Sequence, residues 1–348
     1  MSKRIERIID ANLNRAGEGL HFLEEVARLV LDDAALTQNL KTIRHEILRG
    51  DWGFNRRLVQ SRDAASDVGF DIELENEPRE LPVAVVANSR RVQEALRILE
   101  EMAKLPETAP EMEAVKFKKA RFALYAIEQE LLGRLTRLDK LNGLTGLYAI
   151  LDIQALGKRK YLKVAQEMIK GGASTIQLRD KFTPRAELLN IALELRKLCV
   201  EKGVLFIVND YLDIALASNA DGLHLGQEDL PLSIARKLLP ADMILGGSVN
   251  TVEQAKAAEA AGADYIAVGA MYPTPSKEKP NVVGVERLRK VRGTVSVLLV
   301  AIGGIDEENA GEVAANGADA VAVIGALMNA EDIAEAARNL IKSFEAGK

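Results

Sequence analysis

Cysteine and histidine are scarce in this chain, which has one Cys and three His among its 348 residues. Cys199 therefore cannot form an intrachain disulfide, and it lies in an expected helix (ELRKLCVEKG) with no histidine nearby. This usage is typical of a protein from a reducing compartment. The sequence begins without the apolar run of about 7 to 15 residues that marks a signal peptide, and it has no uncharged stretch of roughly 18 residues elsewhere. We therefore expect a cytoplasmic protein with no membrane partner.

Positive charge is not in excess either. The 46 Lys and Arg residues are outnumbered by 51 Asp and Glu residues, for a net charge of −5, and neither half of the chain is basic. No nucleic-acid partner is therefore expected. The sequence also has no Ser/His/Asp or Cys/His arrangement for nucleophilic catalysis. It has no G-x-x-x-x-G-K-[ST] motif, which excludes a P-loop kinase. Whether the chain forms a homo-oligomer is left open.

The second part of the chain has the rhythm of an α/β protein. From Gly146 onward, short β-branched runs alternate with amphipathic helical segments, as in βαβ units. The expected strands are 146–152, 174–181, 205–210, 221–229, 244–250, 265–274, 297–305 and 320–328. Eight such units in about 200 residues predict a (β/α)8 TIM barrel over residues 146–348. An open doubly wound sheet would need a G-x-G-x-x-G turn after its first strand, and LDIQALGKRK has none.

The first part, residues 1–135, shows the helical period instead. The pattern A-N-x-x-R-x-x-E-x-L-x-x-L-E-E-x-A occurs at Ala11–Ala27 and again, 76 residues later, at Ala87–Ala103. Arg44 and Arg121 repeat at a nearly equal offset of 77 residues. We therefore predict a mainly α-helical, internally duplicated domain built from two related helical hairpins. Residues 136–145 would be a linker or a helix-to-strand joint.

Polar side chains collect where the expected strands end, and in a (β/α)8 barrel this face carries the functional groups. They are Gln177, Arg179 and Lys181 after the second strand, Asn209 and Asp210 after the third, Asp229 after the fourth, and Ser248, Thr274 and Lys277 further along. Glycines in AIGGI and VIGA follow the last two strands, where backbone N–H groups can approach an anion closely. Several cations and two such turns predict a site for a diphosphate and a phosphate together.

Asp210 and Asp229 come from neighbouring strands and would suit one Mg2+, which is commonly held by one or two carboxylates together with phosphate oxygens and water. The alternative is that each aspartate caps the helix that follows it. Arg179 and Lys181 share a face of their strand and could be a solvated pair, and the glycines could be ordinary turn residues. His224 lies inside a strand, and we expect a hydrogen-bonded interior histidine rather than a catalyst.

Five strings, TIQLRDK, FIVNDYLDIA, DGLHLGQEDLP, YPTPSK and VAIGGID, occur in this order at barrel spacing. Together they resemble the thiamine phosphate synthase family over the whole second half of the chain. The resemblance implies a Mg2+-dependent transferase that joins 4-amino-2-methyl-5-(diphosphooxymethyl)pyrimidine to 4-methyl-5-(2-phosphoethyl)thiazole. Diphosphate would leave the pyrimidine methylene and the thiazole nitrogen would attack the cation-like carbon, so no strong base is needed.

The resemblance also implies roles for individual residues. Asp210 and Asp229 would hold Mg2+, and Lys277, Ser248 and Arg179 would act on the departing diphosphate. The expected substrate contacts are Gln177, Leu178, Arg179, Asp180, Lys181, Asn209, Ser248, Thr274, Pro275, Ser276, Lys277, Gly304, Ile324 and Gly325. The chain departs from the family pattern in AVIGA, where relatives usually have Ser beside Val, so one contact to the thiazole phosphate is expected from backbone alone. It also has TPSK where T-x-T-K is common, and the Ser keeps the hydroxyl.

The helical repeats carry polar residues beside their leucine stripe. These are Asn12, Arg15, Glu18, Asn88, Arg91 and Glu94. They form either an internal salt-bridge network or part of a ligand site. The following RDAASDVG segment adds Arg62, Asp63 and Asp67, a composition that suits ligand contact.

This first part is similar to an N-terminal domain fused to some thiamine phosphate synthases, a helical type of hydroxymethylpyrimidine phosphate kinase. That resemblance implies ATP as a further ligand and would supply the pyrimidine diphosphate that the barrel consumes. A dimerisation or regulatory module is the alternative for this domain. For the barrel, the alternatives are a thiazole tautomerase of the same fold and a non-catalytic sensor of a phosphate ligand.

Overall fold

The computed structural model describes residues 2–62, 80–274 and 282–348. The chain divides into two compact units, Met1–Thr136 and Arg137–Lys348. The buried apolar residues of the two units form separate clusters. No helix among the described residues is both long enough and apolar enough to cross a membrane.

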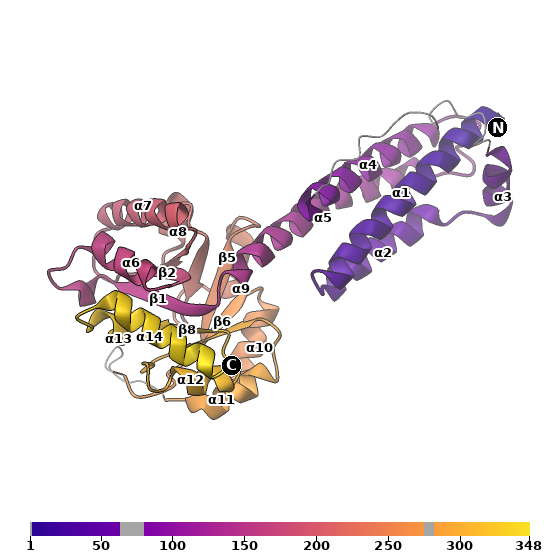
Figure 1. Ribbon diagram of the computed structural model, residues 1–348. Helices are drawn as coiled ribbons and strands as arrows, with labels where there is room; N and C mark the ends of the chain where they lie inside the picture. Colours follow the sequence, from indigo (N-terminus) through magenta and orange to yellow (C-terminus); the bar gives the residue numbers. More distant parts are fainter. Residues whose placement is uncertain (1, 63–79, 275–281) are drawn as a thin grey trace. The chain divides into compact units, whose positions relative to one another are not determined.

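The first unit is helical, and its long helices lie side by side (Figure 1). They are α1 (Lys3–Leu29), α2 (Ala34–Leu48), α4 (Leu81–Met102) and the larger part of α5 (Ala114–Asn142). A shorter helix, α3 (Trp52–Ser61), contacts α1. At the start of α2, the Asp33 carboxylate accepts the backbone N–H of Leu36 at 2.9 Å, which satisfies a donor that the helix itself leaves unpaired. A Cβ added to Gly19 of α1 would lie 2.4 Å from the side chain of Val92 on α4. The two repeat helices therefore pack closely.

The sequence repeat is also a structural repeat. Glu24 of α1 accepts a hydrogen bond from Arg44 of α2 at 2.9 Å. Glu100 of α4 accepts one from Arg121 of α5 at the same distance. Both glutamates are buried, so each ion pair is needed to keep a buried carboxylate satisfied. The matching pairs confirm the predicted internal duplication of the helical domain.

The second unit is a closed barrel of eight parallel strands in sequence order. The strands are β1 (Gly146–Asp152), β2 (Thr175–Arg179), β3 (Leu205–Asn209), β4 (Gly222–Leu225), β5 (Ile244–Val249), β6 (Tyr265–Gly269), β7 (Leu298–Ile302) and β8 (Ala320–Val323). The barrel closes where Gly146 of β1 lies opposite Ala320 of β8. The predicted TIM barrel is therefore confirmed, and the doubly wound alternative is wrong.

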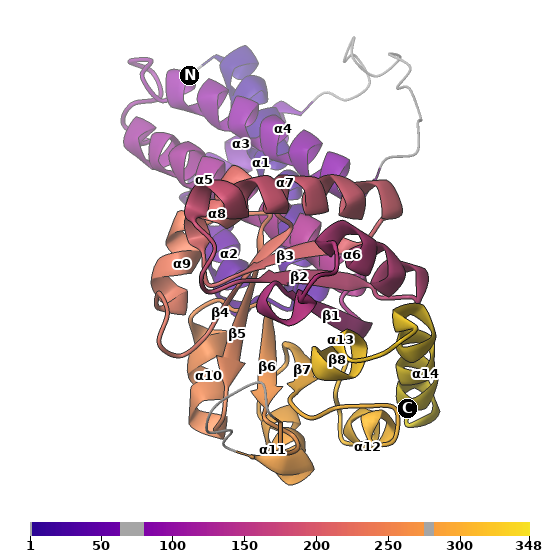
Figure 2. The ribbon, with the colours of Figure 1, turned by 90° about the vertical axis from the view of Figure 1, so that its left-hand side faces the viewer.

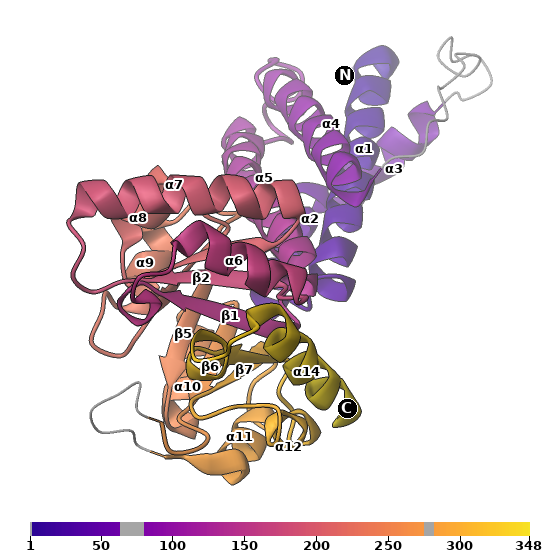
Figure 3. The ribbon, with the colours of Figure 1, turned by 60° about the vertical axis from the view of Figure 1, so that its left-hand side comes forward.

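Helices lie around the outside of the strands (Figure 2). They are α6 (Tyr161–Lys170), α7 (Arg185–Lys202), α8 (Leu212–Ala217), α9 (Leu232–Leu238), α10 (Val252–Ala260), α11 (Gly284–Arg292), α12 (Ala310–Ala315), α13 (Gly325–Met328) and α14 (Ile333–Ala346), with a short 3-10 turn at Gln154–Leu156. The last helix, α14, returns to lie beside β1 and α6 (Figure 3). This arrangement covers the outer face of the sheet with apolar helix faces.

Alternate residues of each strand face the barrel interior and the helix layer, as the two-residue period of a strand requires. On β1, Tyr148 and Ile150 belong to the interior cluster. Leu147, Ala149 and Leu151 belong to the cluster beneath the helices. Because the interior is filled with side chains, ligands have access at the ends of the strands.

The segment between the two expected domains is mostly helical. α5 continues to Asn142, and β1 begins at Gly146. Gly146 has a φ of +75°, a left-handed conformation that glycine adopts without strain. Residues 136–145 therefore contain the end of a helix and a three-residue connection to the first strand.

Candidate active site at the carboxyl ends of the barrel strands

Arg179, the last residue of β2, is held in place by the neighbouring strand. Its register partner on β1 is Asp152, and the two side chains form an ion pair. The Asp152 carboxylate also accepts the backbone N–H of Gln154 at 3.0 Å. The Arg179 side chain is 20% exposed, so it is a partly buried and fixed cation. Lys181, two residues further along, is exposed. The alternative that both residues are simply solvated therefore fits Lys181 but not Arg179.

Asp180 shapes the loop that follows β2. Its carboxylate accepts the backbone N–H of Phe182 at 2.7 Å and of Thr183 at 2.9 Å, and the Thr183 hydroxyl at 2.6 Å. Burial alone would raise the pKa of Asp180, but the bonds from Thr183 and Phe182 outweigh it, and the pKa lies below its usual value. Leu178 is 1% exposed and packs beneath the helices. Direct substrate contacts of these two residues stay predictions, and for Leu178 only the backbone could make them.

Asp210 and Asp229 face each other after β3 and β4. Their carboxyl groups lie close enough to interact, because Asp229 raises the pKa of Asp210. Asp210 has a φ of +63°, which is uncommon for a residue with a side chain, and its N–H donates to the carbonyl of His224 at 2.9 Å. Asp229 accepts the backbone N–H of Gly226 at 2.7 Å. Neither aspartate caps the following helix, because α8 and α9 begin without a side-chain cap.

The electrostatics of this pair explain why it is unusual. Burial raises the pKa of Asp210 to about 7, and the adjacent Asp229 adds to the rise, whereas Arg179 and Lys181 lower it. The two carboxylates and two cations therefore lie within electrostatic reach of one another. Among the described residues, no group of three or more His, Cys, Asp or Glu gathers as a metal site. A metal bound here would also need oxygens from substrate and water.

A chain of buried hydrogen bonds crosses the barrel interior and joins two of the expected site residues. Gln177 Nε2 donates to the hydroxyl of Tyr148 at 2.8 Å, and the hydroxyls of Tyr148 and Tyr265 are 2.8 Å apart. Nδ1 of His224 lies 2.9 Å from the Tyr265 hydroxyl, and its Nε2 lies 2.9 Å from the Ser248 hydroxyl. His224 is the hydrogen-bonded interior residue that the sequence predicted. The chain fixes Gln177 and Ser248, since every link restrains its neighbours.

The sequence did not predict that Tyr148 and Tyr265, the two tyrosines in this series of hydrogen bonds, contribute to the site. They face the barrel interior from β1 and β6, and they are 117 residues apart in sequence. Burial raises the pKa of Tyr148 and of Tyr265 well above the usual value, so both hydroxyls keep their protons. The available signal was a phenol at an inward position of an otherwise apolar strand, because such a hydroxyl needs a buried partner.

The turn after β7 packs against the loop after β6. Gly303 and Gly304 have φ values of +100° and +67°. A Cβ on Gly304 would lie 2.6 Å from the carbonyl oxygen of Pro273, next to Thr274. The Gly304 carbonyl accepts the side-chain amide of Asn309 at 3.0 Å. Glycine is therefore required here by a close approach as well as by the turn.

The end of β8 offers backbone rather than side chains. Ile324 precedes α13, and Gly325 begins it. A Cβ on Gly325 would meet only the Asn329 side chain, at 3.8 Å, so space remains beside this backbone. The other expected contacts, Pro275, Ser276 and Lys277, lie outside the described residues.

In the first unit, the expected loop arginine has a structural partner. Arg62 binds Asp10 of α1 through two hydrogen bonds, of 2.7 and 3.0 Å. Asp63 and Asp67 lie outside the described residues. Arg62 therefore anchors the end of α3 to α1.

Known proteins resemble both units. A family model described as thiamine monophosphate synthase matches residues 147–327, and a model of the ThiD2 family matches residues 7–130. A thiamine-phosphate synthase from Thermosynechococcus vestitus is 38% identical and aligns over 99% of this chain and 97% of its own length. One from Methanospirillum hungatei is 51% identical over 56% of this chain and 94% of its own length. The structure of a thiamine phosphate pyrophosphorylase from Pyrococcus furiosus has a TM-score of 0.55 and 41% identity, and the match covers 59% of this chain and 98% of that one.

Proposed function

The chain belongs to the thiamine monophosphate synthase family, and from this premise we propose that its barrel is a transferase that joins a pyrimidine diphosphate to a thiazole phosphate. The pairing of Asp210 with Asp229 is the observation that carries the proposal. Two carboxylates held together in a partly buried place repel each other unless a proton or a cation lies between them. A thiazole tautomerase would handle no diphosphate, so this pair favours the synthase over that alternative.

The donor set fits Mg2+, because two carboxylate oxygens are hard ligands and diphosphate oxygens can complete the coordination. Asp210 and Asp229 would hold the ion, which when bound neutralises charge on the diphosphate. Arg179 lies beside this pair, already oriented by Asp152, and contributes a fixed positive charge toward the leaving group. Lys181 adds a second charge from the same side.

The remaining residues position the two substrates. Gln177 is held by Tyr148, so its amide can orient the pyrimidine. Ser248 is held by His224, so its hydroxyl can donate to the diphosphate. The backbone at Gly304 and Gly325 would bind the thiazole phosphate. The bond from the methylene carbon to the diphosphate oxygen breaks, the bond from that carbon to the thiazole nitrogen forms, and catalysis rests on orientation and charge.

The test is release of diphosphate from a mixture of both substrates and Mg2+. We expect Asp210→Asn and Asp229→Asn each to lower kcat about hundredfold or more, as loss of a charge-stabilising group commonly does. Asp213→Asn is the matched control, because this α8 carboxylate is 67% exposed. Unchanged turnover in the double variant at Asp210 and Asp229 would refute the proposal. A sensor would release no diphosphate in any variant.

For the helical unit, we propose phosphorylation of hydroxymethylpyrimidine phosphate by ATP. Its match to the ThiD2 family over residues 7–130 supports this, and the product would be the substrate of the barrel. The full chain carrying Asp210→Asn should accumulate pyrimidine diphosphate and ADP when given the monophosphate and ATP. If the unit served only to form a homo-oligomer, no ADP would appear.

A further inference from the structure

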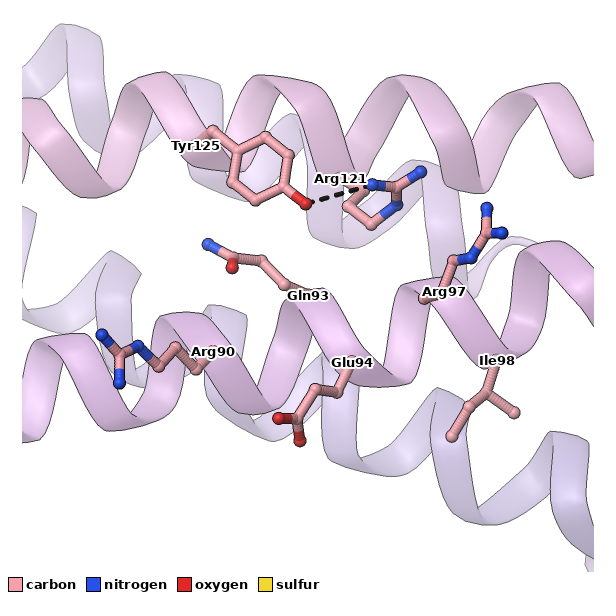
Figure 4. Close-up of a pocket in the computed structure, with 7 residues that line it drawn as sticks. All are labelled: Arg90, Gln93, Glu94, Arg97, Ile98, Arg121 and Tyr125. Atoms are coloured by element: carbon pink, nitrogen blue, oxygen red, sulfur yellow. Dashed lines mark hydrogen bonds between the residues drawn. The ribbon is translucent and has the colours of Figure 1, made fainter.

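Two hollows adjoin along α4 of the helical unit. The smaller, of about 200 Å³, is lined from α1 by Asn12 and Arg15 and from α4 by residues that include Arg91 and Glu94. The larger, of about 680 Å³, extends between α4 and α5 (Figure 4). Glu94 and Ile98 line both hollows. A ligand in the smaller hollow would therefore lie next to one in the larger.

The smaller hollow has two arginines and one glutamate among its lining residues. Arg15 and Arg91 are equivalent residues of the two repeats, and the pairing of α1 with α4 brings both to the same hollow. Neither guanidinium has an ion-pair partner among residues 2–62, 80–274 and 282–348. By contrast, Arg97 and Arg121 of the larger hollow both pair with Glu100. The salt-bridge interpretation of the repeat thus does not account for Arg15 and Arg91.

Asn12 supplies a second, independent sign of a ligand. It is 4% exposed, and its Nδ2 donates to the carbonyl of Ile8 at 2.8 Å. Its Oδ1 is buried and has no hydrogen-bond partner among the residues that the structure describes. A buried amide atom left unpaired costs on the order of 1–3 kcal/mol. Asn12 lines the hollow, so a ligand there would lie beside this incompletely paired amide.

We propose that this smaller hollow, which we call the repeat hollow, binds a small phosphorylated heterocycle, with Arg15 and Arg91 on its phosphate and Asn12 on a polar group of the ring. A planar guanidinium group can donate two parallel hydrogen bonds to two oxygens of one phosphate. Pockets for drug-sized ligands hold about 300–1,000 Å³, so a hollow of about 200 Å³ suits a single ring and not a nucleotide.

This inference rests on the proposed kinase function and gives its phosphorylated substrate a place. The phosphoryl donor would occupy the larger hollow. In the transfer, the bond between the bridging oxygen and the terminal phosphorus of ATP breaks. A bond forms from that phosphorus to an ionised oxygen of the bound monophosphate. The products are ADP and the pyrimidine diphosphate, and no proton is exchanged between doubly ionised monophosphate and fully ionised ATP.

The experiment uses the full chain and hydroxymethylpyrimidine phosphate as the probe. Calorimetry gives Kd, and hydrogen exchange with mass spectrometry shows which helices the probe protects. We expect protection of α1 and α4, and a Kd about tenfold or more weaker in Arg15→Gln and in Arg91→Gln, because each loses a charge-assisted hydrogen bond. Arg56→Gln is the matched control, since Arg56 is exposed on α3 and lines neither hollow. It should change Kd less than twofold.

An unchanged Kd in Arg91→Gln, or protection confined to barrel peptides, would overturn the repeat hollow. Both arginines are exposed, and unaltered thermal unfolding of the variants would show that they still fold. If the probe binds as expected but ADP never forms, the site stands and the kinase proposal fails. If ADP forms equally fast in wild type and in both arginine variants, the kinase stands and the site fails.

Discussion

At the scale of single residues, Tyr265 is the centre of the buried hydrogen-bond series in the barrel, because its hydroxyl contacts both Tyr148 and His224. Tyr265→Phe leaves each of those groups short of one buried partner. We expect the free energy of unfolding, measured in urea, to fall by about 1–3 kcal/mol. Tyr161→Phe is the control, because the Tyr161 hydroxyl bonds to Glu194 at the surface, and it should cost under about 0.5 kcal/mol. An equal fall in the free energy of unfolding in both variants would show that the buried hydrogen bonds of Tyr265 do not stabilise the fold.

Cys199 gives a prediction about pH. Burial raises the pKa of Cys199 to about 12, Asp221 adds to the rise and Arg196 opposes it, whereas the ordinary value is 9.0. Between these values the unfolded chain has lost a proton that the folded protein keeps, so the free energy of unfolding falls as pH rises. From about pH 9 to pH 11, wild type should lose up to ~1.4 kcal/mol per pH unit more than Cys199→Ala.

The alanine variant also loses packing, but that cost does not depend on pH and cancels when slopes are compared. The tyrosines titrate in both proteins and cancel in the same way. Urea unfolding at several pH values gives both curves. Parallel curves would mean that the thiol of Cys199 is not protected from ionisation.

The sequence could place single site residues only where strand ends alone decide their position. Asp210 and Asp229 were expected at the ends of neighbouring parallel strands. They follow β3 and β4, close enough for Asp229 to raise the pKa of Asp210. The contact between Tyr148 and Tyr265 joins β1 to β6 across the interior. Predicting it would require knowing both that the barrel closes and that the two side chains point inward at the same level. The role of Asp180 depends on the path of the loop after β2, which no short-range pattern specifies.

At the scale of elements, a comparison of two glycines distinguishes the effect of backbone strain from the effect of loop packing. Gly304 and Gly203 have nearly equal φ values, +67° and +65°, so alanine should cost each about 1–2 kcal/mol in strain. Only at Gly304 does the added Cβ meet backbone, the Pro273 carbonyl oxygen at 2.6 Å, while nothing lies within 4 Å at Gly203. Gly304→Ala should therefore displace the loops after β6 and β7.

We expect Gly304→Ala to raise the KM for the thiazole phosphate about ten- to hundredfold, because small displacements of binding groups are costly. Gly203→Ala, at the end of α7, should alter stability alone. Initial rates with the thiazole phosphate varied at saturating pyrimidine diphosphate provide the measurement. Similar KM values in the two variants would remove Gly304 from the phosphate site.

Strand positions were predictable because each begins and ends in a change of composition. GLYAILD matches β1, Gly146–Asp152, and LFIVND ends one residue after β3, Leu205–Asn209. The expected segments at 221–229 and 265–274 overran β4 and β6, Gly222–Leu225 and Tyr265–Gly269. Their final residues belong to the loops after these strands, which sequence alone could not separate from strand. The expected linker at 136–145 contains the end of α5 because its leucines and charged residues continue the helical period.

At the scale of the whole molecule, the two units carry separate cores and separate family matches. The relative from Methanospirillum hungatei aligns over 94% of its own length but only 56% of this chain. The rest of this chain is thus an addition relative to that protein. The proposed chemistry divides in the same way, since one unit would make the diphosphate that the other consumes.

This division predicts that two defective chains can complement each other. Arg91→Gln should form thiamine phosphate only when pyrimidine diphosphate is supplied, because only the proposed kinase step is impaired. Asp210→Asn should make the diphosphate and stop there. Mixed in equal amounts with the monophosphate, ATP, thiazole phosphate and Mg2+, the two should restore product formation, since a small charged intermediate that dissociates from one chain can diffuse to another.

Thiamine phosphate separated by chromatography gives the readout, with each variant alone as its control. Product from Asp210→Asn alone would show that the barrel does not need this carboxylate. Failure of Arg91→Gln even when given the diphosphate would show that the helical unit acts on the barrel reaction itself. Failure of the mixture alone, with both single controls as expected, would show that the intermediate is not released to solution, because a diffusing diphosphate would reach the intact barrel of the partner chain.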